Sequence, residues 1–363
     1  MIPLTVSIPG YQLYRRFGTP RLYPANLTVS VTYRCNSRCR TCRIYDKRAL
    51  EFSVEEYDKT FASIGPRVFW ITMSGGEPFL RRDFAEICAL AYVHCKPRIL
   101  NIPTNGILSD VVGEKVEQIA KNAPETRVIV NVSLDEIEER HDRIRNVDGN
   151  YAKAIRTIEN LKRVKCSNLS VGIHTVISRF NVDRFAQIYQ EVLKLGPDAY
   201  ITEIAEQRVE LGTVGEDIVP AEDAYCRAID YLCAGIRGQR HRGIHGVTQA
   251  FRSEYYRMVK RIIREKKQIV PCYAGFMSAH IAPDGNVWAC CTKAESMGNL
   301  RDELYDFGKV WFSKRAQEVR KPIREELCYC PLANASYTNM LVSYPALLRV
   351  LKTLLASKMR KYF

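Results

Sequence analysis

Long apolar runs are missing from this 363-residue sequence, since no stretch approaches the 18 or so residues that a membrane-spanning helix needs. The N-terminus, MIPLTVSIPGYQLYRRF, lacks a charged segment followed by an apolar one, so we expect no signal peptide. There is no low-complexity linker and no internal repeat beyond an alternation of strand-like and helix-like segments. These absences exclude an integral membrane protein, and we expect a globular protein of the reducing cytoplasm.

A disulfide framework is also not expected, because the 13 cysteines are odd in number and a cytoplasmic chain keeps its thiols reduced. Cys88, Cys226 and Cys233 stand alone in apolar helical patterns, which is typical of buried structural thiols. The clustered cysteines are therefore expected to bind metal.

Positive charge is abundant but unevenly placed. The net charge is +14, and the segments 237–267 and 347–363 together supply thirteen of those charges. The tail also places its leucines on one half of a helical wheel, as a basic amphipathic helix does. An anionic partner such as a membrane surface is one interpretation, and a solvated basic face or a helix docked on the protein is the other.

Six strand-like segments alternate with amphipathic helical segments from about residue 27 onward. Their near-continuous apolar character predicts parallel strands in an α/β sheet or partial (β/α)6 barrel, with every strand C-terminus on one rim. The expected strands are residues 26–33, 68–74, 98–105, 127–135, 169–178 and 199–206, and the expected helices are 53–64, 81–95, 109–122, 150–164 and 183–196.

The segment RCNSRCRTC carries Cys35, Cys39 and Cys42 directly after the first expected strand. A closed structural zinc site wants four ligands, so three thiolates without a fourth indicate a metal centre with one open position. At the end of the second strand comes MSGGEP, residues 73–78. Small and polar residues at such strand ends are where α/β folds gather ligands.

The CxxxCxxC spacing followed by GGEP resembles the radical S-adenosylmethionine (radical SAM) superfamily, over about residues 25–240. This resemblance implies that the three cysteines hold a 4Fe–4S cluster whose fourth iron is chelated by S-adenosylmethionine. Reductive cleavage of that cofactor would yield a 5′-deoxyadenosyl radical that abstracts a substrate hydrogen. It also implies a one-electron donor such as flavodoxin or ferredoxin.

The cofactor contacts implied by the resemblance fall on the strand ends. Gly75, Gly76, Glu77 and Pro78 match the motif that holds the methionine amino group, and Asn105 and Ser133 match positions near the ribose or carboxylate. Asp135 either joins them or caps the next helix. One departure is Thr41, where the family often has an aromatic residue before the third cysteine, and Tyr45 is a possible substitute.

A second cysteine group surrounds the segment PDGNVWACC. A cysteine, a DGxVxxC hairpin, a GNL turn at 298–300 and closing cysteines resemble the SPASM domain or its shorter relative, Twitch. The resemblance implies one auxiliary 4Fe–4S cluster, and a zinc ribbon built from the same thiolates is the alternative. The expected ligands are Cys272, Cys290, Cys328 and Cys330, and Cys291 could replace one of them.

Three other residue groups attract attention without a definite role. HDRIR, residues 141–145, resembles a sequence frequent in SPASM-type enzymes and either positions substrate or cofactor or forms an ion-paired helix start. His174 and Glu203 are conceivable substrate-binding or proton-handling groups, but a lone strand histidine is more often a core residue, so we assign them none.

These patterns divide the chain into five expected parts: an N-terminal extension (1–24), a radical SAM core (25–240), a basic helical linker (241–268), a SPASM/Twitch-like domain (269–340) and a basic tail helix (341–363).

The leading functional interpretation is a radical enzyme, peripheral to the inner membrane face, that acts on a lipid, polyprenyl-linked or other anionic amphiphilic substrate. The alternative is a SPASM-type maturase of a peptide or protein, although no spare stretch of about 80 residues exists for the leader-recognition domain that many such maturases carry. RNA modification ranks lower, because no RNA-binding module is recognisable and no nucleic acid partner is expected. A non-catalytic iron–sulfur carrier would leave GGEP unexplained.

Overall fold

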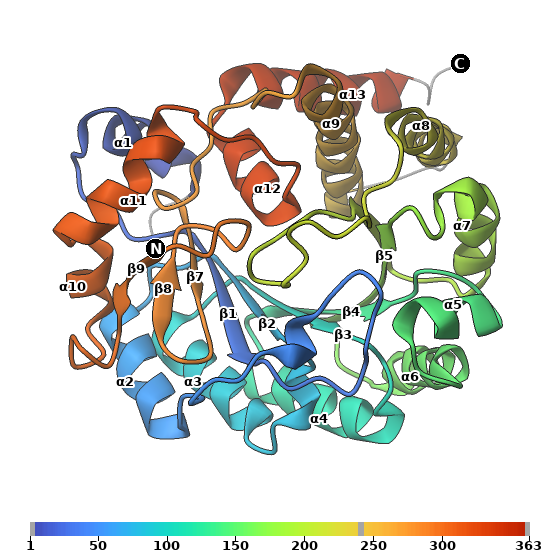
Figure 1. The fold of residues 1–363 in the computed structure, drawn as a ribbon, viewed down its shortest axis with the longest axis horizontal. Coiled ribbons are helices and arrows are strands. Elements are labelled where there is room, and N and C mark those ends of the chain that lie inside the picture. The colour runs from blue at the N-terminus through green and yellow to red at the C-terminus, as the bar shows by residue number, and fades with distance from the viewer. Residues whose placement is uncertain (1–3, 239–242, 360–363) are drawn as a thin grey trace.

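The fold was analysed in a computed structural model that describes residues 4–238 and 243–359. Six parallel strands in consecutive order form the core of one nine-stranded sheet, β6-β5-β4-β3-β2-β1-β7-β8-β9 (Figure 1). The strands are β1 (Asn26–Thr32), β2 (Trp70–Gly75), β3 (Ile99–Thr104), β4 (Arg127–Ser133), β5 (Leu169–Ile177), β6 (Ala199–Ile204), β7 (Ser278–Ile281), β8 (Asn286–Trp288) and β9 (Ser296–Asn299). The α/β prediction, a partial barrel of parallel strands, is confirmed.

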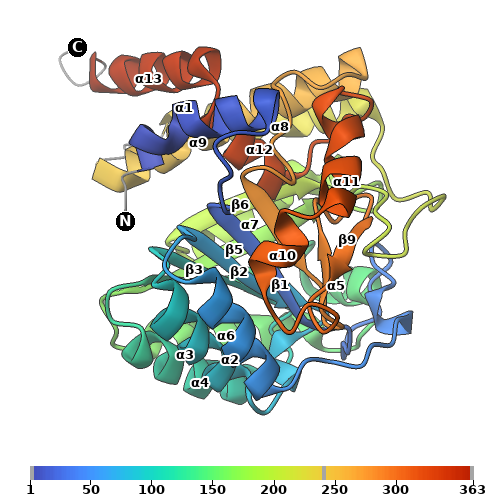
Figure 2. The same cartoon turned by 90° about the vertical axis from the view of Figure 1, so that its left-hand side faces the viewer.

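Helices connect and cover these strands. The α-helices are α1 (Leu4–Phe17), α2 (Val54–Ile64), α3 (Phe84–Cys95), α4 (Ser109–Asn122), α5 (Glu138–Arg145), α6 (Asn150–Arg163), α7 (Phe185–Lys194), α8 (Glu222–Gly238), α9 (Gly243–Glu265), α10 (Phe307–Trp311), α11 (Lys314–Arg324), α12 (Ala333–Leu341) and α13 (Tyr344–Met359), and the short 3-10 helices are η1 (Ile44–Asp46), η2 (Pro78–Leu80) and η3 (Val182–Arg184). Helices α2, α3, α4 and α6 line one side of the sheet, while α9, α12 and α13 lie across the opposite end (Figure 2).

The alternation of apolar and polar side chains along β1 shows how the sheet separates the hydrophobic core, on its helix-covered face, from the inside of the barrel. Leu27, Val29 and Val31 are fully buried and belong to the main hydrophobic core, which also contains Phe61 of α2. The residues between them are polar, and Ser30 faces Glu210 and His280 inside the barrel. Successive side chains of a strand point to opposite faces, so one face packs on helices and the other is free to line a site.

The C-terminal extension continues the barrel sheet rather than forming a separate layer. β7 pairs in parallel with β1, and the hairpin expected from DGxV is present as antiparallel β7 and β8. Arg301 clamps the extension to the core through two hydrogen bonds to Glu56 of α2, at 2.6 and 3.0 Å. The two parts are therefore packed as one continuous structure.

The N-terminal extension also packs on the iron–sulfur part of the chain. Tyr14 of α1 makes an edge contact with Phe276, with ring centroids 5.7 Å apart. Arg15 donates a 2.9 Å hydrogen bond to the carbonyl of Cys272 and pairs with Glu326. Neither this helix nor α8 was anticipated from the sequence pattern.

The tail helix α13 docks on α9. This arrangement corresponds to the docked helix that the sequence offered as an alternative to a membrane-binding one. Ala346 and Val350 are buried, and the Arg349 Nε donates a 2.7 Å hydrogen bond to Glu254. An outer stripe of Leu348 and Leu351, each at least half exposed, does not take part in this docking.

The basic residues of α9 are largely paired within the protein. Arg257 pairs with Glu254, Lys260 with Asp230 and Arg264 with Glu222. Asp230 and Glu222 lie outside the segment 237–267, so the last two of these pairs each offset one of its excess positive charges. Among the described residues, no helix is both long and apolar enough to cross a membrane.

Candidate functional site

The first cysteine group lies on the loop that follows β1, at the carboxyl edge of the parallel sheet. Cys35, Cys39 and Cys42 are all half-buried and line one cavity of about 200 Å3. Burial raises the pKa of Cys35 to about 11 and that of Cys42 to about 12. Both thiols are therefore protonated near neutral pH, and metal binding must displace those protons.

Hydrogen-bond donors surround the sulfur atoms. The Ser37 Oγ lies 3.1 Å from the Cys39 Sγ, and the Arg145 Nη1 donates to the same sulfur at 3.6 Å. The Asn105 Nδ2 donates to the Cys35 Sγ at 3.8 Å. Such donors stabilise thiolate charge and tune the potential of an iron–sulfur cluster, so the surroundings suit a redox centre.

Gly75 and Gly76 are required where β2 ends against the cysteine loop. A Cβ at Gly75, which has φ +127°, would lie 2.2 Å from the Thr32 carbonyl oxygen, and one at Gly76 would lie 2.2 Å from that of Arg34. The Gly76 N–H donates to the Thr32 oxygen at 2.7 Å. The glycines therefore form a cradle under the cysteine loop that any Cβ would fill.

Glu77 is buried beneath this cradle rather than lining the cavity. Its carboxylate accepts hydrogen bonds from the Phe79 N–H at 3.2 Å, the Thr104 Oγ1 at 3.0 Å and the Asn105 N–H at 2.7 Å. Burial raises the pKa of Glu77 to about 7, although these bonds act in the opposite direction. A carboxylate has further lone pairs, so a ligand ammonium could still be accepted there. Pro78 is buried and begins η2.

Asn105 and Ser133 both line the cavity, at the ends of β3 and β4. Asp135 does not cap a helix, because α5 begins without a side-chain cap. Its carboxylate instead accepts the Val176 N–H at 2.9 Å and pairs with Arg145 at 2.8 Å. The capping alternative for Asp135 is therefore wrong.

Two residues of the HDRIR segment lie in different surroundings: His141 is buried in the protein, and Arg145 lines the cavity. His141 is fully buried, and its Nδ1 accepts the Asp135 N–H at 3.1 Å while its Nε2 bonds to Asn150. Burial lowers the pKa of His141 to about 4, so this imidazole is neutral. Arg145 lines the cavity; burial opposes its charge, but Asp135 and the nearby thiols more than offset this and raise its pKa.

Four charged or titratable groups form a further part of the cavity wall: His174, Glu203, Glu206 and Arg208. The Arg208 Nε bonds to Glu206 at 2.8 Å and its Nη2 to Glu203 at 3.4 Å, and the His174 Nε2 lies 3.5 Å from Glu203. The remaining Glu206 oxygen is buried and lacks a hydrogen-bond partner.

The pKa values of the two glutamates of this wall are shifted in opposite directions. Burial raises the pKa of Glu206. It acts the same way on Glu203, but His174 and Arg208 more than offset it and bring that pKa to about 2. Sequence reasoning assigned no role to His174 and Glu203 and missed Glu206 and Arg208. The one available signal for these last two was their position just beyond the end of β6.

The missing aromatic residue before Cys42 is not replaced within the cavity. Thr41 and Ile44 line it, whereas Tyr45 does not. The Tyr45 ring instead faces the Arg38 guanidinium, 5.2 Å from the ring centroid.

The second cysteine group is assembled from three separate segments. Cys272 precedes β7, Cys290 follows β8, and Cys328 and Cys330 follow α11. Burial raises the pKa of Cys272 to about 12, and the charges of Cys290 and Cys328 add to this rise. The charges of Cys272 and Cys290 likewise add to a rise in the pKa of Cys330. The four expected ligands are thus brought together.

Both cysteine groups are spread more widely than a single zinc ion requires. Sulfurs around tetrahedral zinc, with bonds near 2.3 Å, would lie about 3.8 Å apart. Over residues 4–238 and 243–359, no three cysteine sulfurs lie within 4.8 Å of one another. This spacing, the donor-rich surroundings and the glycine cradle fit a larger iron–sulfur cluster.

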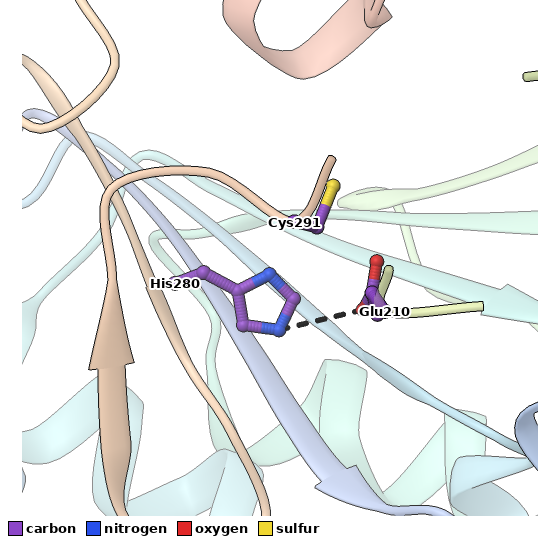
Figure 3. A group of neighbouring side chains, drawn as sticks. All are labelled: Glu210, His280 and Cys291. Atoms are coloured by element: carbon purple, nitrogen blue, oxygen red, sulfur yellow. Dashed lines mark ion pairs between the residues drawn. The ribbon is translucent and has the colours of Figure 1, made fainter. Parts of the chain in front are cut away.

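Cys291, which follows Cys290 in the chain, lies close to Glu210 and His280. The donor atoms of these three residues lie within 4.8 Å of one another, and Figure 3 shows them meeting from three different segments. The His280 Nε2 lies 3.5 Å from the Glu210 carboxylate and 2.9 Å from the Ser30 Oγ.

Comparison with known families agrees with this geometry. Residues 29–192 match the radical SAM superfamily, and residues 272–331 match SPASM, an iron–sulfur cluster-binding domain. The first match contains the cavity cysteines and the glycine cradle, and the second contains all four expected auxiliary ligands.

Two curated relatives are similar over most of this chain. The antilisterial bacteriocin subtilosin biosynthesis protein AlbA of Bacillus subtilis is 28% identical over 292 residues, which are 78% of this chain but only 59% of AlbA. The mycofactocin maturase MftC of Mycolicibacterium smegmatis is 25% identical over 346 residues, 90% of this chain and 80% of MftC.

Among solved structures, native anSMEcpe with bound AdoMet and the Cp18Cys peptide superposes with a TM-score of 0.62. The superposition covers 93% of this chain and 98% of that one, at 15% identity. At this identity the likeness shows a shared fold.

Proposed function

The chain is a radical SAM enzyme with a SPASM domain, and we propose that it modifies a ribosomally made peptide or a protein. The observation that carries this proposal is the similarity to MftC, a maturase, across 90% of the chain. AlbA, named for bacteriocin biosynthesis, points the same way. The structure of anSMEcpe with a peptide shows that a protein of this fold binds one.

We further propose which residues hold the cofactors. Cys35, Cys39 and Cys42 would bind the catalytic 4Fe–4S cluster, and Cys272, Cys290, Cys328 and Cys330 the auxiliary cluster. Gly75, Gly76, Asn105 and Ser133, which line the cavity, would contact S-adenosylmethionine. Glu77 and Pro78, which are buried, would position it indirectly by holding these segments in place. When bound and reduced by a donor such as flavodoxin or ferredoxin, these groups supply one-electron hydrogen abstraction.

Arg145 is the cationic group best placed to meet a cofactor carboxylate. Its guanidinium lines the cavity, is nearly buried, and is held by Asp135 at 2.8 Å and by the Cys39 sulfur. A guanidinium fixed by a buried carboxylate loses little entropy when it binds a second anion. Arg145 would therefore orient the cofactor against the cysteine loop.

The wall of Glu203, Glu206 and Arg208 would receive the substrate. It lines the same cavity as the cysteines, and one Glu206 oxygen is buried without a partner. A buried acceptor of this kind is costly unless a ligand satisfies it. The wall therefore suits a peptide group that carries hydrogen-bond donors.

The lipid substrate expected from the sequence finds no support among the relatives, and the peptide alternative fits them better. The structural basis for membrane association is also reduced, because α13 is docked on α9 and the basic residues of α9 are ion-paired.

The test is cofactor cleavage by anaerobically reconstituted enzyme. We would measure 5′-deoxyadenosine with a small-peptide fraction, a membrane-lipid extract or buffer alone, and search the peptides for a mass change by mass spectrometry. We expect the peptide fraction to stimulate cleavage and to contain a modified peptide. Stimulation by the lipid extract alone would contradict the proposal.

A matched variant separates the cofactor cleavage that depends on peptide from the basal cleavage that occurs without it. Glu206→Gln keeps the shape of the cavity wall but removes the carboxylate charge. We expect it to retain basal cleavage and to lose the peptide-dependent increase. Equal stimulation of variant and wild type would remove this wall from substrate binding.

A further inference from the structure

The strongest unexplained group of side chains is the cluster of Glu210, His280 and Cys291 (Figure 3). Glu210 lies on the loop after β6, His280 on β7, and Cys291 just after β8. All three residues are buried, and the group is the one set of three metal-binding side chain types found this close together in the described part of the chain. Neither cofactor of the proposed reaction uses it.

The charge of Glu210 is only partly compensated. Arg208 and Lys47 are the cations whose charges act with it, but Arg208 is already paired with Glu203 and Glu206. The direct neighbours of the Glu210 carboxylate are a hydroxyl and an imidazole. A buried carboxylate and imidazole lie side by side here, with a thiol close to both, and these are donor types that a divalent cation can bring together.

We propose that Glu210, His280 and Cys291 bind a single Zn2+ ion. One thiolate, one imidazole and one carboxylate are the donor types that zinc takes, at bond lengths of about 2.0–2.3 Å. Donors around such an ion would lie roughly 3.3–3.8 Å apart. The observed limit of 4.8 Å is close to this, so small side-chain rotations would close the site.

Ser30 supplies the support that a metal-binding imidazole needs. Its Oγ lies 2.9 Å from the His280 Nε2 and 3.4 Å from the Glu210 Oε1. Because this hydrogen bond occupies Nε2, Nδ1 is the ring nitrogen left to bind zinc, and the Ser30 bond would fix the orientation of the ring. Three protein donors leave a fourth position for water.

The ion would fix the loop that forms the substrate wall. This loop already contacts the second cysteine segment, through the Val209 N–H to the Thr292 carbonyl at 3.0 Å and the Glu210 N–H to the Cys291 carbonyl at 3.2 Å. It also contacts the first, since the Arg43 N–H donates to the Leu211 carbonyl at 2.8 Å. Zinc would thus tie the cavity wall to both cluster-bearing segments.

The experiment uses the reconstituted enzyme, dialysed against a chelator and supplied with one equivalent of Zn2+. Zinc and iron are measured per chain, and the zinc absorption edge reports the ligands of zinc alone despite the iron. We expect one zinc, bound through one sulfur near 2.3 Å and lighter atoms near about 2.0–2.1 Å. Failure to retain zinc, or zinc with three or four sulfurs in vacant cluster sites, would overturn the proposal.

Variants identify the ligands independently of activity. We expect Cys291→Ser to remove the sulfur contribution and His280→Ala to lower zinc affinity by at least about tenfold, with iron unchanged in both. Cys166→Ser, a half-buried thiol outside the site, should change neither metal. Ser30→Ala keeps all three ligands and should weaken zinc binding less. Loss of iron rather than zinc from Cys291→Ser would make Cys291 a cluster ligand and refute the site.

Discussion

The two cysteine groups differ in how the chain builds them and in what space they border. The first lies within residues 35–42 and borders a cavity of about 200 Å3. The second draws on residues 272, 290 and 328–330, and the cavity beside Cys290 measures only about 10 Å3. A void of that size holds at most one water, so the first group is where cofactor and substrate can meet.

The two cysteine groups also differ in the polarity of their surroundings. Ser37, Asn105 and Arg145 place hydrogen-bond donors against the sulfurs of the first group. In the second, Cys272 belongs to the hydrophobic core and Cys290 packs against it, while Cys328 and Cys330 are half-buried. The comparison teaches that one fold can keep a polar site beside a cavity for chemistry and a second, more apolar site suited to structure or electron transfer.

Removing each group in turn is the strongest way to break this comparison. We expect Cys35→Ala/Cys39→Ala/Cys42→Ala to abolish 5′-deoxyadenosine formation and to lower the iron content from about eight to about four per chain, because an open cluster site is lost. Cys272→Ala/Cys290→Ala should lose a similar amount of iron but keep cofactor cleavage. Cleavage retained by the triple variant would reverse the assignment of the two groups.

Arg145 tests the polar character of the first group. Arg145→Gln leaves the buried Asp135 carboxylate without its cation, and breaking such a pair typically costs about 3–5 kcal/mol of the free energy of unfolding. Asp135→Asn/Arg145→Gln should recover much of that stability, measured by urea unfolding, but not S-adenosylmethionine affinity, measured by calorimetry. Recovery of both would show that Arg145 has only a structural role.

Alanine substitutions at two glycines, one for each cysteine group, test the comparison further. A Cβ at Gly76 would strike the Arg34 carbonyl at 2.2 Å, and one at Gly285, in the β7–β8 turn at φ +87°, would strike Phe52 at 2.4 Å. We expect each alanine variant to cost about 1–3 kcal/mol in urea unfolding. Gly76→Ala should lower the iron of the first group and Gly285→Ala that of the second.

Gly113→Ala is the control for these glycine variants, because its Cβ would meet only Asn160 at 3.6 Å inside α4. It should leave iron unchanged and raise stability by roughly 0.5–1 kcal/mol, as expected for glycine in a helix. Equal iron loss in Gly76→Ala and Gly285→Ala would mean that the two regions fold as one unit.

The smallest effect concerns the pH dependence of Glu77. Its pKa is raised from 4.5 to about 7, so between these values the folded protein holds a proton that the unfolded chain has lost. This group therefore makes stability fall as pH rises from about 4.5 to about 7, by at most about 1.4 kcal/mol per pH unit. The free energy of unfolding of reconstituted protein would be measured in urea at pH 5, 6 and 7. Its decrease with pH should be smaller for Glu77→Gln than for the wild type. Parallel slopes would show that Glu77 is ionised throughout.

Local patterns in the sequence were sufficient for much of the fold and for the first group. The strand periods, the CxxxCxxC spacing and GGEP lie in short contiguous segments, and consecutive parallel strands necessarily bring their carboxyl ends to one rim. The DGxV turn likewise predicted the β7–β8 hairpin. What is encoded within a few residues of chain can be recognised from the chain alone.

Only the tertiary structure decided which distant side chains face one another. It placed Glu206 and Arg208 in the same cavity lining as the cysteines, joined Arg145 to Asp135, and brought Cys291 close to Glu210. It also paired Lys260 and Arg264 of α9 with Asp230 and Glu222 of α8, where the sequence had left an anionic partner and a solvated basic face as alternatives. Charge and hydrogen-bond partners depend on distance in space, and a one-dimensional pattern contains no such distance between remote segments.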